Sequence, residues 1–355
     1  MDDLSRVQWL RALEARRIAI IKPSALGDVV QALPLARVLR RAFPSAEISW
    51  IVNRELEDLL VGHPCLAETI PFVRRGGVRK FATLLETLRS RRFDLVFDLQ
   101  GLLRTGVMTL ATGARVRIGL ETAREGSRWC CTDLIPHTGR DVPAHARYWR
   151  IAETLGLAGE SAGVEIAITP TERSWVYEQL RGLPRPVVAV HAGAGWATKR
   201  WPAPRFAAAL KGLAGTVVVV GSKAELPLAE VVMTELKESG APILNLAGRT
   251  TLRQLASLLG AVDAVVSNDS GPMHLAAAMQ TPVVGVFTCT SPRLSGPGGA
   301  QHELVATSVA CAASYCKKCP QRGAAHLACF EALPVERVRM ALERVLRKSR
   351  AVDAG

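Results

Sequence analysis

The chain has 355 residues, of which 48% are hydrophobic and 22% charged, and its formal net charge is +13. Its length exceeds the usual size of one hydrophobic core, so we expect two folded domains. The composition excludes a disordered chain, and an aromatic content of 5% argues against a nucleic-acid surface of stacked rings. The charge has two interpretations: an ordinary arginine-rich surface, or attraction to an anionic substrate or membrane surface.

The first 17 residues lack the continuous apolar core of a signal peptide, and no later stretch has the apolar length of a bilayer span. We therefore expect a cytoplasmic protein that could contact the inner face of the cytoplasmic membrane. Leu4, Val7, Leu10 and Leu13 lie along one side of a predicted N-terminal helix. The mixed charges of this helix favour docking on the protein over insertion into a membrane.

Apolar β-branched runs alternate with longer amphipathic stretches, which predicts β-α-β units and parallel doubly wound sheets. In the first half, we expect strands at 17–23, 47–52, 68–73 and 93–101 and helices at 28–44, 54–64 and 81–92. In the second half, we expect strands at 185–193, 215–222, 242–248, 263–269 and 281–287 and helices at 202–213, 224–236, 251–262, 271–279 and 334–350. The proline-bearing segment 168–187 predicts an interdomain connection.

These elements predict an N-terminal domain over 1–172, a C-terminal domain over 173–333, and a final helix and tail over 334–355. Two open α/β domains imply a cleft, and ligands bind outside the carboxyl ends of the strands. The candidate loops are therefore 22–28, 100–105, 191–200, 221–225 and 267–274.

The loop at 22–28 places Asp28 in the first turn of a predicted helix. It does not contain G-x-G-x-x-G, so the sequence does not support a dinucleotide-dependent oxidoreductase. Asp28 has two interpretations. It could be an acid stabilised by the helix dipole, or a carboxylate that removes a proton from an incoming hydroxyl.

The loop at 191–200 has His191 at a strand end, glycines in the turn, and Lys199 near its end. Glycine lets the backbone approach a ligand closely, and lysine offers a point charge to phosphate. A glycine turn with a surface lysine is the alternative. Glu225, in the next candidate loop, could accept hydrogen bonds from ribose or sugar hydroxyls, or it could cap the following helix.

The stretch 267–287 surrounds a helix N-terminus with Asp269, Ser270, Gly271 and His274. Unpaired N–H groups and the helix dipole attract anions, so this stretch predicts a phosphate site. Asp269 fits such a site if it binds sugar hydroxyls or holds the loop. His274 has the alternative of a buried, satisfied histidine.

Four cysteines cluster near the C-terminus, at Cys311, Cys316, Cys319 and Cys329. In a cytoplasmic chain of this size they do not predict a disulfide framework. They could form a structural metal site, but their spacing matches no standard zinc finger, so we favour free or redox-sensitive thiols.

Taken together, the segments 22–44, 191–202, 217–225 and 246–287 resemble glycosyltransferase family 9, the heptosyltransferases of lipopolysaccharide inner-core assembly. The resemblance implies a GT-B architecture, in which two doubly wound, Rossmann-like domains face a cleft. The N-terminal domain would bind the acceptor and the C-terminal domain the nucleotide-sugar. It also implies inverting transfer of heptose from ADP-heptose to Kdo-lipid A or a heptosylated acceptor, with no metal or other cofactor.

The resemblance implies a role for each matching residue. Asp28 would be the general base, Lys199 would neutralise the leaving diphosphate, Ser270 and Gly271 would bind the diphosphate, Asp269 and His274 would contact the donor, and Glu225 would hold the ribose. Gly193 and Ala194 stand where one branch of the family has hydroxyl residues. Phosphate contacts there would come from backbone N–H groups, with Thr198 as a candidate substitute.

The acceptor implied by the resemblance is an anionic, lipid-linked saccharide. We expect Arg104, Arg117 and Arg124 to meet it, which gives the basic charge a function without nucleic acid. Two alternatives remain: a family member with another nucleotide-sugar or acceptor, and a non-catalytic saccharide- or nucleotide-binding relative. The presence of Asp28, Lys199, Asp269 and His274 together argues against the second.

Overall fold

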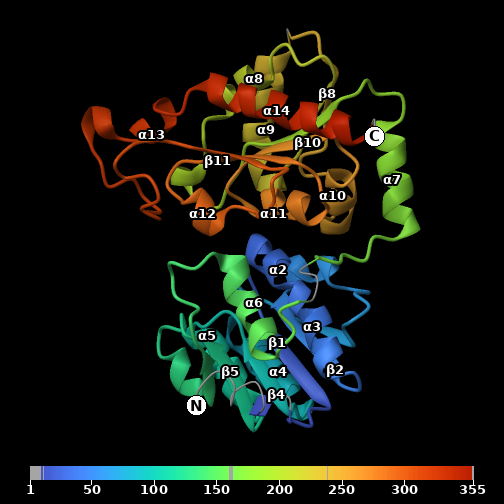
Figure 1. The fold of residues 1–355 in the computed structure, drawn as a ribbon, viewed down its shortest axis with the longest axis vertical. Coiled ribbons are helices and arrows are strands. Elements are labelled where there is room, and N and C mark those ends of the chain that lie inside the picture. Colours follow the sequence, from blue (N-terminus) through green and yellow to red (C-terminus); the bar gives the residue numbers. More distant parts are fainter. Residues whose placement is uncertain (1–8, 11, 160–162, 238, 354–355) are drawn as a thin grey trace. The chain divides into compact units, whose positions relative to one another are not determined.

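The structure is a computed structural model that describes residues 9–10, 12–159, 163–237 and 239–353. The chain divides into two compact units, Met1–Ala167 and Ile168–Gly355 (Figure 1). Most of the predicted N-terminal helix, including Leu4 and Val7, lies outside the described residues.

Within its described residues, the first unit contains a six-stranded parallel sheet in the order β3-β2-β1-β4-β5-β6. Its strands are β1 (Arg17–Ile21), β2 (Glu47–Asn53), β3 (Glu68–Phe72), β4 (Leu95–Asp98), β5 (Val116–Leu120) and β6 (Asp133–Ile135). Its helices are α2 (Leu26–Ala32), α3 (Pro34–Ala42), η1 (Arg54–Leu59), α4 (Gly77–Ser90), α5 (Leu103–Ala111), η2 (Ser127–Cys130) and α6 (Ala144–Thr154), where η marks a 3-10 helix.

The described part of the second unit has a six-stranded parallel sheet in the order β12-β11-β10-β7-β8-β9. Its strands are β7 (Val187–His191), β8 (Thr216–Val219), β9 (Ile243–Asn245), β10 (Ala264–Asn268), β11 (Val283–Phe287) and β12 (Glu303–Ala306). Its helices are α7 (Pro170–Leu180), η3 (Ala197–Lys199), α8 (Ala203–Leu210), η4 (Lys223–Glu225), α9 (Leu226–Leu236), α10 (Leu252–Leu259), α11 (Gly271–Ala278), α12 (Pro292–Ser295), η5 (Gly323–Ala325), α13 (Ala328–Glu331) and α14 (Val335–Asp353).

The two sheets have the same strand order, because β9-β8-β7-β10-β11-β12 repeats the order of the first sheet. The predicted pair of doubly wound parallel sheets is therefore confirmed. In this order the winding reverses between β1 and β4, and again between β7 and β10. Ligands of such sheets bind at the carboxyl ends of the strands beside the reversal. The residues that follow β1, β4, β7 and β10 are thus placed where a ligand site is expected.

The final helix packs on the second sheet. Val338, Ala341 and Val345 of α14 are fully buried in the same core as the strand residues Val188 and Val284. The helix therefore contributes to the core of the second unit, although the sequence suggested a separate terminal segment.

Three predicted elements differ from the structure. The helix expected over 28–44 is split into α2 and α3, because Pro34 begins a new helix and has no N–H for an intrahelical hydrogen bond. The segment 168–187 contains α7, which starts with a capping box between Thr169 and Glu172 and packs on α10. The predicted boundary between residues 172 and 173 lies inside this helix. The helix expected over 54–64 is reduced to η1.

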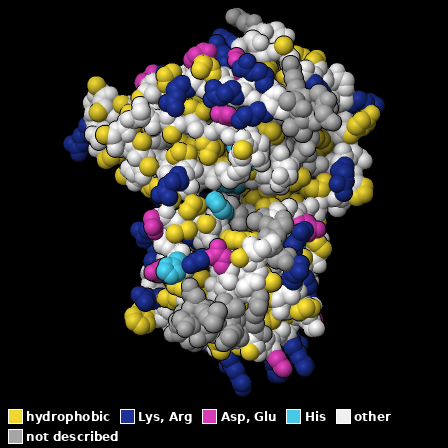
Figure 2. All heavy atoms as spheres, in the orientation of Figure 1, with side chains coloured by type: hydrophobic (Ala, Val, Ile, Leu, Met, Phe, Trp, Pro, Cys, Tyr) yellow, Lys and Arg dark blue, Asp and Glu magenta, His cyan; other side chains and the backbone are white. Residues whose placement is uncertain are grey.

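The charged side chains of the described residues are interspersed on the face shown in Figure 2. Several arginines there and elsewhere pair with carboxylates, as in Arg91 with Glu68 and Arg344 with Glu303. This pattern fits an ordinary arginine-rich surface better than a single basic stripe. In the part of the chain that the structure describes, no helix combines the length and hydropathy of a membrane span.

Candidate active site

Lys199 and Asp269 form an ion pair beside the reversal of the second sheet. Asp269 directly follows β10, and Lys199 ends η3. Nζ of Lys199 lies 2.7 Å from Oδ2 of Asp269, whose side chain is only 4% exposed. The ammonium also lies 4.7 Å from the centroid of the Trp196 ring, which is a cation–π distance. The pair explains why an acidic residue occurs beside a predicted phosphate site: Asp269 fixes the position of the lysine.

Asn268 joins the loops that carry this ion pair. Its side chain is fully buried at the end of β10. The amide Nδ2 donates to the carbonyl of Ala192 at 2.8 Å, and Oδ1 accepts a hydrogen bond from the Trp201 N–H at 3.0 Å. A buried amide that bonds at both ends holds the loop after β7 against the end of β10.

His191 connects two of the predicted donor-binding residues. It is buried at the end of β7, with Nδ1 lying 3.0 Å from Ser270 Oγ and Nε2 lying 3.4 Å from Glu225 Oε2. Ser270 precedes α11, and Gly271 begins it. The first N–H groups of a helix have no intrahelical acceptor, so this end of α11 suits an anion. One imidazole therefore links the candidate diphosphate site to Glu225.

Glu225 lies at the end of η4, in a capping box with Ser222. Its Oε2 accepts hydrogen bonds from the Ser222 N–H and Oγ, each at 2.8 Å. Burial opposes ionisation of Glu225, but the bonds from His191 and Ser222 outweigh it and lower the pKa to about 2. Glu225 thus completes the capping box of η4, whereas its side chain makes no capping hydrogen bond to α9, the helix that follows. It is an anion near neutral pH, and a carboxylate can accept further hydrogen bonds from a ligand.

Gly193 has no room for a side chain. A Cβ placed there would lie 1.8 Å from Oε1 of Glu225 and 2.9 Å from Nε2 of His191. Ala194 is 4% exposed, and its carbonyl accepts a hydrogen bond from Arg200 at 2.7 Å. The absence of a hydroxyl side chain at Gly193 therefore follows from close packing against Glu225.

Thr198 is buried and bonds to the cysteine-rich segment. Its Oγ1 donates to the backbone carbonyl of Cys316 at 2.8 Å, and its own carbonyl accepts a bond from Thr288 at 2.6 Å. Nearby, the Tyr315 N–H donates to the carbonyl of Cys289 at 2.8 Å. The Thr198 hydroxyl therefore holds the cysteine-rich segment, because it donates its proton to the hydrogen bond with the Cys316 carbonyl. His274 is also buried, with Nε2 lying 3.9 Å from Oδ1 of Asp269.

In the first unit, Asp28 lies beside the reversal of its own sheet. It occupies the first turn of α2, and its side chain is 37% exposed. Oδ2 accepts a hydrogen bond from the Ala25 N–H at 3.2 Å, as expected for a helix N-terminal acid, while Oδ1 accepts one from the Tyr148 hydroxyl at 3.2 Å. The contact with Tyr148 has no part in capping the helix.

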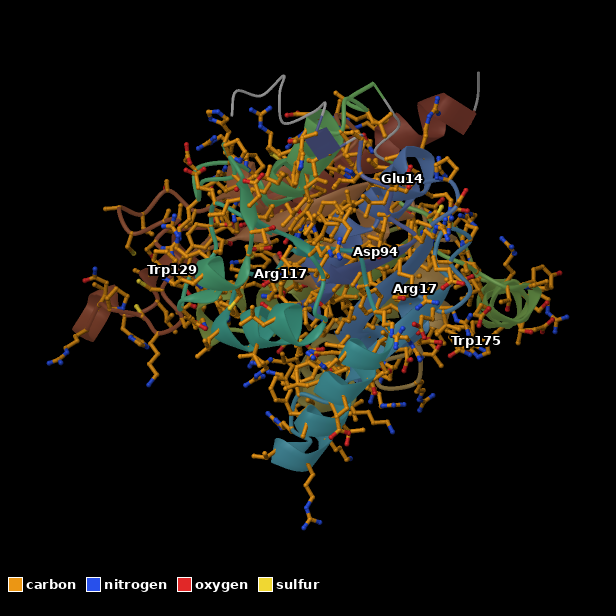
Figure 3. All side chains as sticks on the ribbon, turned by 90° about the horizontal axis from the view of Figure 1, so that it is seen from below. Glu14, Arg17, Asp94, Arg117, Trp129 and Trp175 are labelled. Carbon is orange, nitrogen blue, oxygen red and sulfur yellow. The ribbon has the colours of Figure 1, made fainter. Side chains whose placement is uncertain are left out.

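The three predicted acceptor arginines do not lie together. Arg104 is exposed in the first turn of α5, and Arg124 is exposed on the loop after β5, where its N–H donates to the carbonyl of Gly101 at 2.9 Å. The guanidinium of Arg117 instead donates to the carbonyls of Ala114 and Cys130 at the amino end of β5. Figure 3 views the first unit from this end, where Arg117 is labelled with Arg17 and Asp94.

The family model of Glycosyltransferase family 9 (heptosyltransferase) matches residues 81–325. The chain belongs to glycosyltransferase family 9. It is similar to "Lipopolysaccharide heptosyltransferase 1" of Pseudomonas aeruginosa, at 28% identity over 85% of this chain and 87% of the relative. It is also similar to "Lipopolysaccharide core heptosyltransferase OpsX" of Haemophilus influenzae, at 27% identity over 79% and 82%.

Two solved structures resemble this family 9 glycosyltransferase over nearly their whole length. "E. coli ADP-heptose lps heptosyltransferase II" superposes with a TM-score of 0.77 at 25% identity, covering 94% of this chain and 99% of that chain. A family 9 protein from Veillonella parvula superposes with a TM-score of 0.79 at 24% identity, covering 95% and 99%. These comparisons confirm the predicted GT-B architecture, and the family confirms that the chain is a glycosyltransferase.

The cysteines of this glycosyltransferase are all described, and none forms a disulfide. Burial is the main cause that raises the pKa of the Cys329 thiol to about 11, and the neighbouring thiols of Cys311, Cys289 and Cys319 contribute to this rise. Among the described residues, no group of three or more His, Cys, Asp or Glu side chains is arranged to hold a metal ion. The four-cysteine metal site, an alternative in the sequence, finds no support.

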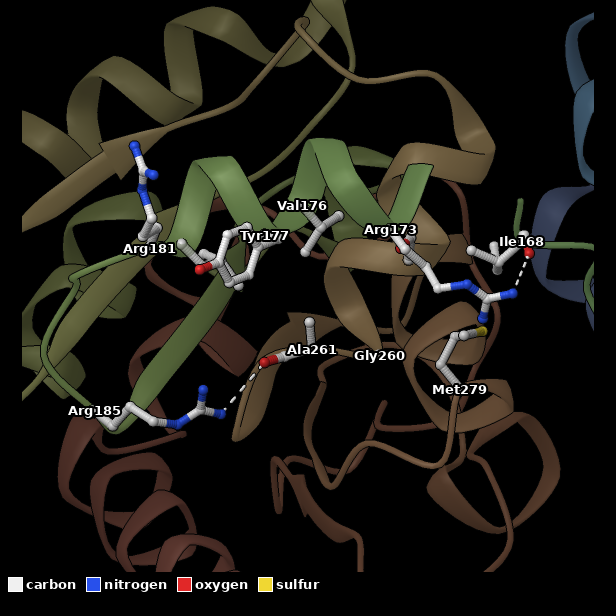
Figure 4. Close-up of a pocket in the computed structure, with 11 residues that line it drawn as sticks. Ile168, Arg173, Val176, Tyr177, Arg181, Arg185, Gly260, Ala261 and Met279 are labelled. Carbon is white, nitrogen blue, oxygen red and sulfur yellow. Dashed lines mark hydrogen bonds between the residues drawn. The ribbon is translucent and has the colours of Figure 1, made fainter. Parts of the chain in front are cut away.

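A cavity of about 510 Å³ lies elsewhere in the second unit of the glycosyltransferase, under α7 (Figure 4). Arg173 and Arg185 lie at its edge and donate to the backbone carbonyls of Ile168 and Ala261. None of the candidate donor-binding residues lines this cavity.

Lys22, Tyr148 and Asn268 are not among the site residues that the sequence predicts. Lys22 and Asn268 lie within the candidate loops 22–28 and 267–274, and this position is the usable signal for them. Tyr148 lies in an amphipathic helix 120 residues from Asp28, so no local pattern connects the two.

Proposed function

We propose that this glycosyltransferase moves heptose from ADP-heptose to the inner core of lipopolysaccharide, with Kdo-lipid A or a heptosylated acceptor as substrate. The observation that supports it most is the Lys199–Asp269 ion pair beside the N-terminus of α11. A fixed cation next to unpaired helix N–H groups suits a nucleoside diphosphate leaving group. Three of the relatives described above are named as lipopolysaccharide heptosyltransferases, and one of these names includes ADP-heptose, which supports heptose as the sugar and lipopolysaccharide as the class of acceptor.

The second unit binds the donor in this proposal. The N-terminus of α11, with Ser270 and Gly271, receives the diphosphate, and Lys199 neutralises the charge that develops on it. The backbone at Gly193 and Ala194 lies close to the phosphates, Asp269 and His274 border the sugar, and Glu225 accepts hydrogen bonds from the ribose. Thr198 takes no direct part, because its hydroxyl proton is bonded to Cys316.

The reaction is an inverting displacement with Asp28 as the general base. The acceptor hydroxyl oxygen forms a bond to the anomeric carbon of heptose, and its proton passes to the Asp28 carboxylate. The bond between the anomeric carbon and the diphosphate oxygen breaks, and ADP leaves with the electron pair. Lys199 and α11 supply the positive charge that this leaving group requires, so we propose that no metal cofactor takes part.

The first unit binds the anionic acceptor, and Arg104 and Arg124 are the side chains that we assign to it. Arg117 is omitted because its guanidinium bonds two backbone carbonyls. We place the reaction in the cytoplasm, at the inner face of the membrane that carries the lipid-linked acceptor. Eight unpaired thiols suit a reducing compartment.

The test measures ADP release from ADP-heptose, with and without Kdo-lipid A and with a chelator present. The proteins are wild type, Asp28→Ala and, as a matched control, Asp141→Ala on an exposed loop. We expect acceptor-dependent, chelator-insensitive release that Asp28→Ala abolishes and Asp141→Ala retains. A wild-type protein that binds ADP-heptose but releases no ADP would contradict this acceptor. If the wild type does not bind ADP-heptose, the proposed donor is wrong. If the chelator abolishes ADP release, the proposal that the reaction needs no metal is wrong.

A further inference from the structure

Asp28 is surrounded by buried polar groups from three other elements of the first unit. Lys22 follows β1, Asp98 ends β4, and Tyr148 projects from α6, which packs against α2. All three side chains are buried, whereas Asp28 is 37% exposed. The candidate base is therefore open to a ligand on one side and held from the interior on the other.

The contacts engage both oxygens of the carboxylate. Oδ1 receives the Tyr148 hydroxyl at 3.2 Å. Oδ2 receives the Ala25 N–H at 3.2 Å and lies 3.8 Å from Nζ of Lys22. A carboxylate with donors on both oxygens cannot rotate freely, and donors of this kind stabilise its anionic form.

Lys22 and Tyr148 support each other. Nζ of Lys22 lies 5.2 Å from the centroid of the Tyr148 ring, a cation–π distance, and 3.5 Å from the carbonyl of Leu99. Asp98 accepts hydrogen bonds from the N–H groups of Gln100 and Gly101, so the second acid near Lys22 is held by its own loop.

Burial favours the neutral forms of both neighbours, with different consequences. Burial raises the pKa of Tyr148 well above its ordinary value, and the Asp28 anion raises it further, so the hydroxyl keeps its proton to donate. Burial lowers the pKa of Lys22, while Asp28 and Asp98 oppose that effect and Arg147 of α6 adds to it. Arg147 and Asp98 therefore face the cluster formed by Asp28, Lys22 and Tyr148.

We propose that Tyr148 and Lys22 are positioning residues for the catalytic base: they fix the Asp28 carboxylate in one orientation and keep it ionised for proton removal from the acceptor hydroxyl. This inference rests on the proposed function of Asp28. It assigns to α6 a part in the reaction that acts through the Asp28 carboxylate.

The first experiment follows Asp28 directly, by NMR of the full-length protein labelled with ¹³C at the aspartate carboxyl carbons. Asp28→Asn identifies the signal. Tyr148→Phe keeps the ring and removes the hydroxyl, and Tyr177→Phe is the matched control, because Tyr177 is exposed on α7 in the other unit. We expect Tyr148→Phe to raise the titration midpoint of Asp28 by about one pH unit, and Tyr177→Phe to leave it unchanged. An unchanged midpoint in a folded Tyr148→Phe protein would overturn the proposal.

The second experiment records acceptor-dependent ADP release from about pH 3 to 9, because the ordinary pKa of an aspartate is about 3.9. We expect Tyr148→Phe to move the acidic limb of kcat upward by the same amount, so that the loss is about tenfold on that limb and shrinks at higher pH, with KM unchanged. A loss that is equal at every pH would show a purely structural role and overturn the proposal.

Lys22→Met is the second variant, and it tests the proposal if Tyr148→Phe does not fold. An upward shift in the titration midpoint of Asp28 in Lys22→Met supports the proposal, and an unchanged midpoint overturns it. If the wild type releases no ADP while the NMR midpoint still moves in Tyr148→Phe, the proposed function fails and the contact between Tyr148 and the Asp28 anion is upheld.

Discussion

Nζ of Lys199 lies 2.7 Å from Oδ2 of Asp269, and the two residues are 70 positions apart in the chain. Asp269 is almost completely buried, so the main role of this carboxylate is to hold Lys199 in position. The other oxygen, Oδ1, lies 3.9 Å from His274. The lysine is therefore held in place before any ligand arrives, which is the arrangement that electrostatic catalysis requires.

Replacing Lys199 removes the positive charge beside α11. We expect Lys199→Met to lower kcat for ADP release about 100- to 1,000-fold, the usual effect of losing one charge-stabilising group. Lys211→Met, on an exposed lysine just after α8, serves as the control and should retain activity. Steady-state kinetics decide the point, and a loss of less than threefold in Lys199→Met would count against the leaving-group role.

The same substitution tests the energetics of the ion pair. Lys199→Met leaves the buried Asp269 carboxylate without its cation, so we expect the free energy of unfolding to fall by about 3 kcal/mol. The double variant Lys199→Met/Asp269→Leu removes the unpaired charge and should recover part of that loss. Urea unfolding measures both, and equal stability of the single and double variants would refute the explanation.

Gly193→Ala tests the close packing against Glu225. The added Cβ would lie 1.8 Å from Oε1 of Glu225, so Glu225 must move. We expect the free energy of unfolding to fall by about 1–3 kcal/mol, together with weaker binding of ADP. Gly195→Ala is the matched control, because a Cβ there meets no atom within 4 Å. Calorimetry of ADP binding and urea unfolding measure the two effects, and similar results for both variants would contradict the prediction.

Glu225 gives stability a specific pH dependence. Its pKa is lowered from 4.5 to about 2, so its contribution is complete above pH 4.5 and disappears as the pH falls toward 2. We expect Glu225→Gln to cost on the order of 3 kcal/mol at pH 7 and much less near pH 2. Glu230→Gln, on an exposed position of α9, is the control. Unfolding measured across this pH range should show the two variants converging at low pH.

Thr198 separates a structural role from a ligand-binding role. Thr198→Val removes the hydroxyl that donates to Cys316, and we expect it to lower the free energy of unfolding by about 1–2 kcal/mol. Thr198→Ser keeps a hydroxyl and should recover most of the loss. Urea unfolding and donor KM are measured together. If Thr198→Val leaves the free energy of unfolding unchanged and raises KM for the donor, Thr198 binds phosphate and the structural role is wrong.

The sequence predicts those parts of the fold that leave a local pattern. β7 and β11 are continuous apolar runs, as expected for parallel strands covered on both faces. β6 has only three residues, which is too short for a periodicity. α7 buries Val176 as its inward side chain, so its apolar stripe is too weak to distinguish a helix from a connection.

The same limit applies to the site. Asp28, Lys199 and Ser270 each lie in a local motif, and the sequence predicts them. Tyr148 and Asp28 meet only because α6 packs on α2, and this contact depends on the tertiary fold. The sequence also left two roles open for Glu225, and the structure shows it bonded to Ser222 in the capping box of η4.

The cysteine-rich segment is held through its backbone at two points, one on the Lys199 loop and one just after β11. Thr198 binds the carbonyl of Cys316, and the Tyr315 N–H binds the carbonyl of Cys289. A backbone carbonyl remains when a side chain changes, but an insertion or deletion moves it along the chain. Over evolutionary time, this segment can therefore exchange residues, cysteines included, more readily than it can change its length between Cys289 and Cys316.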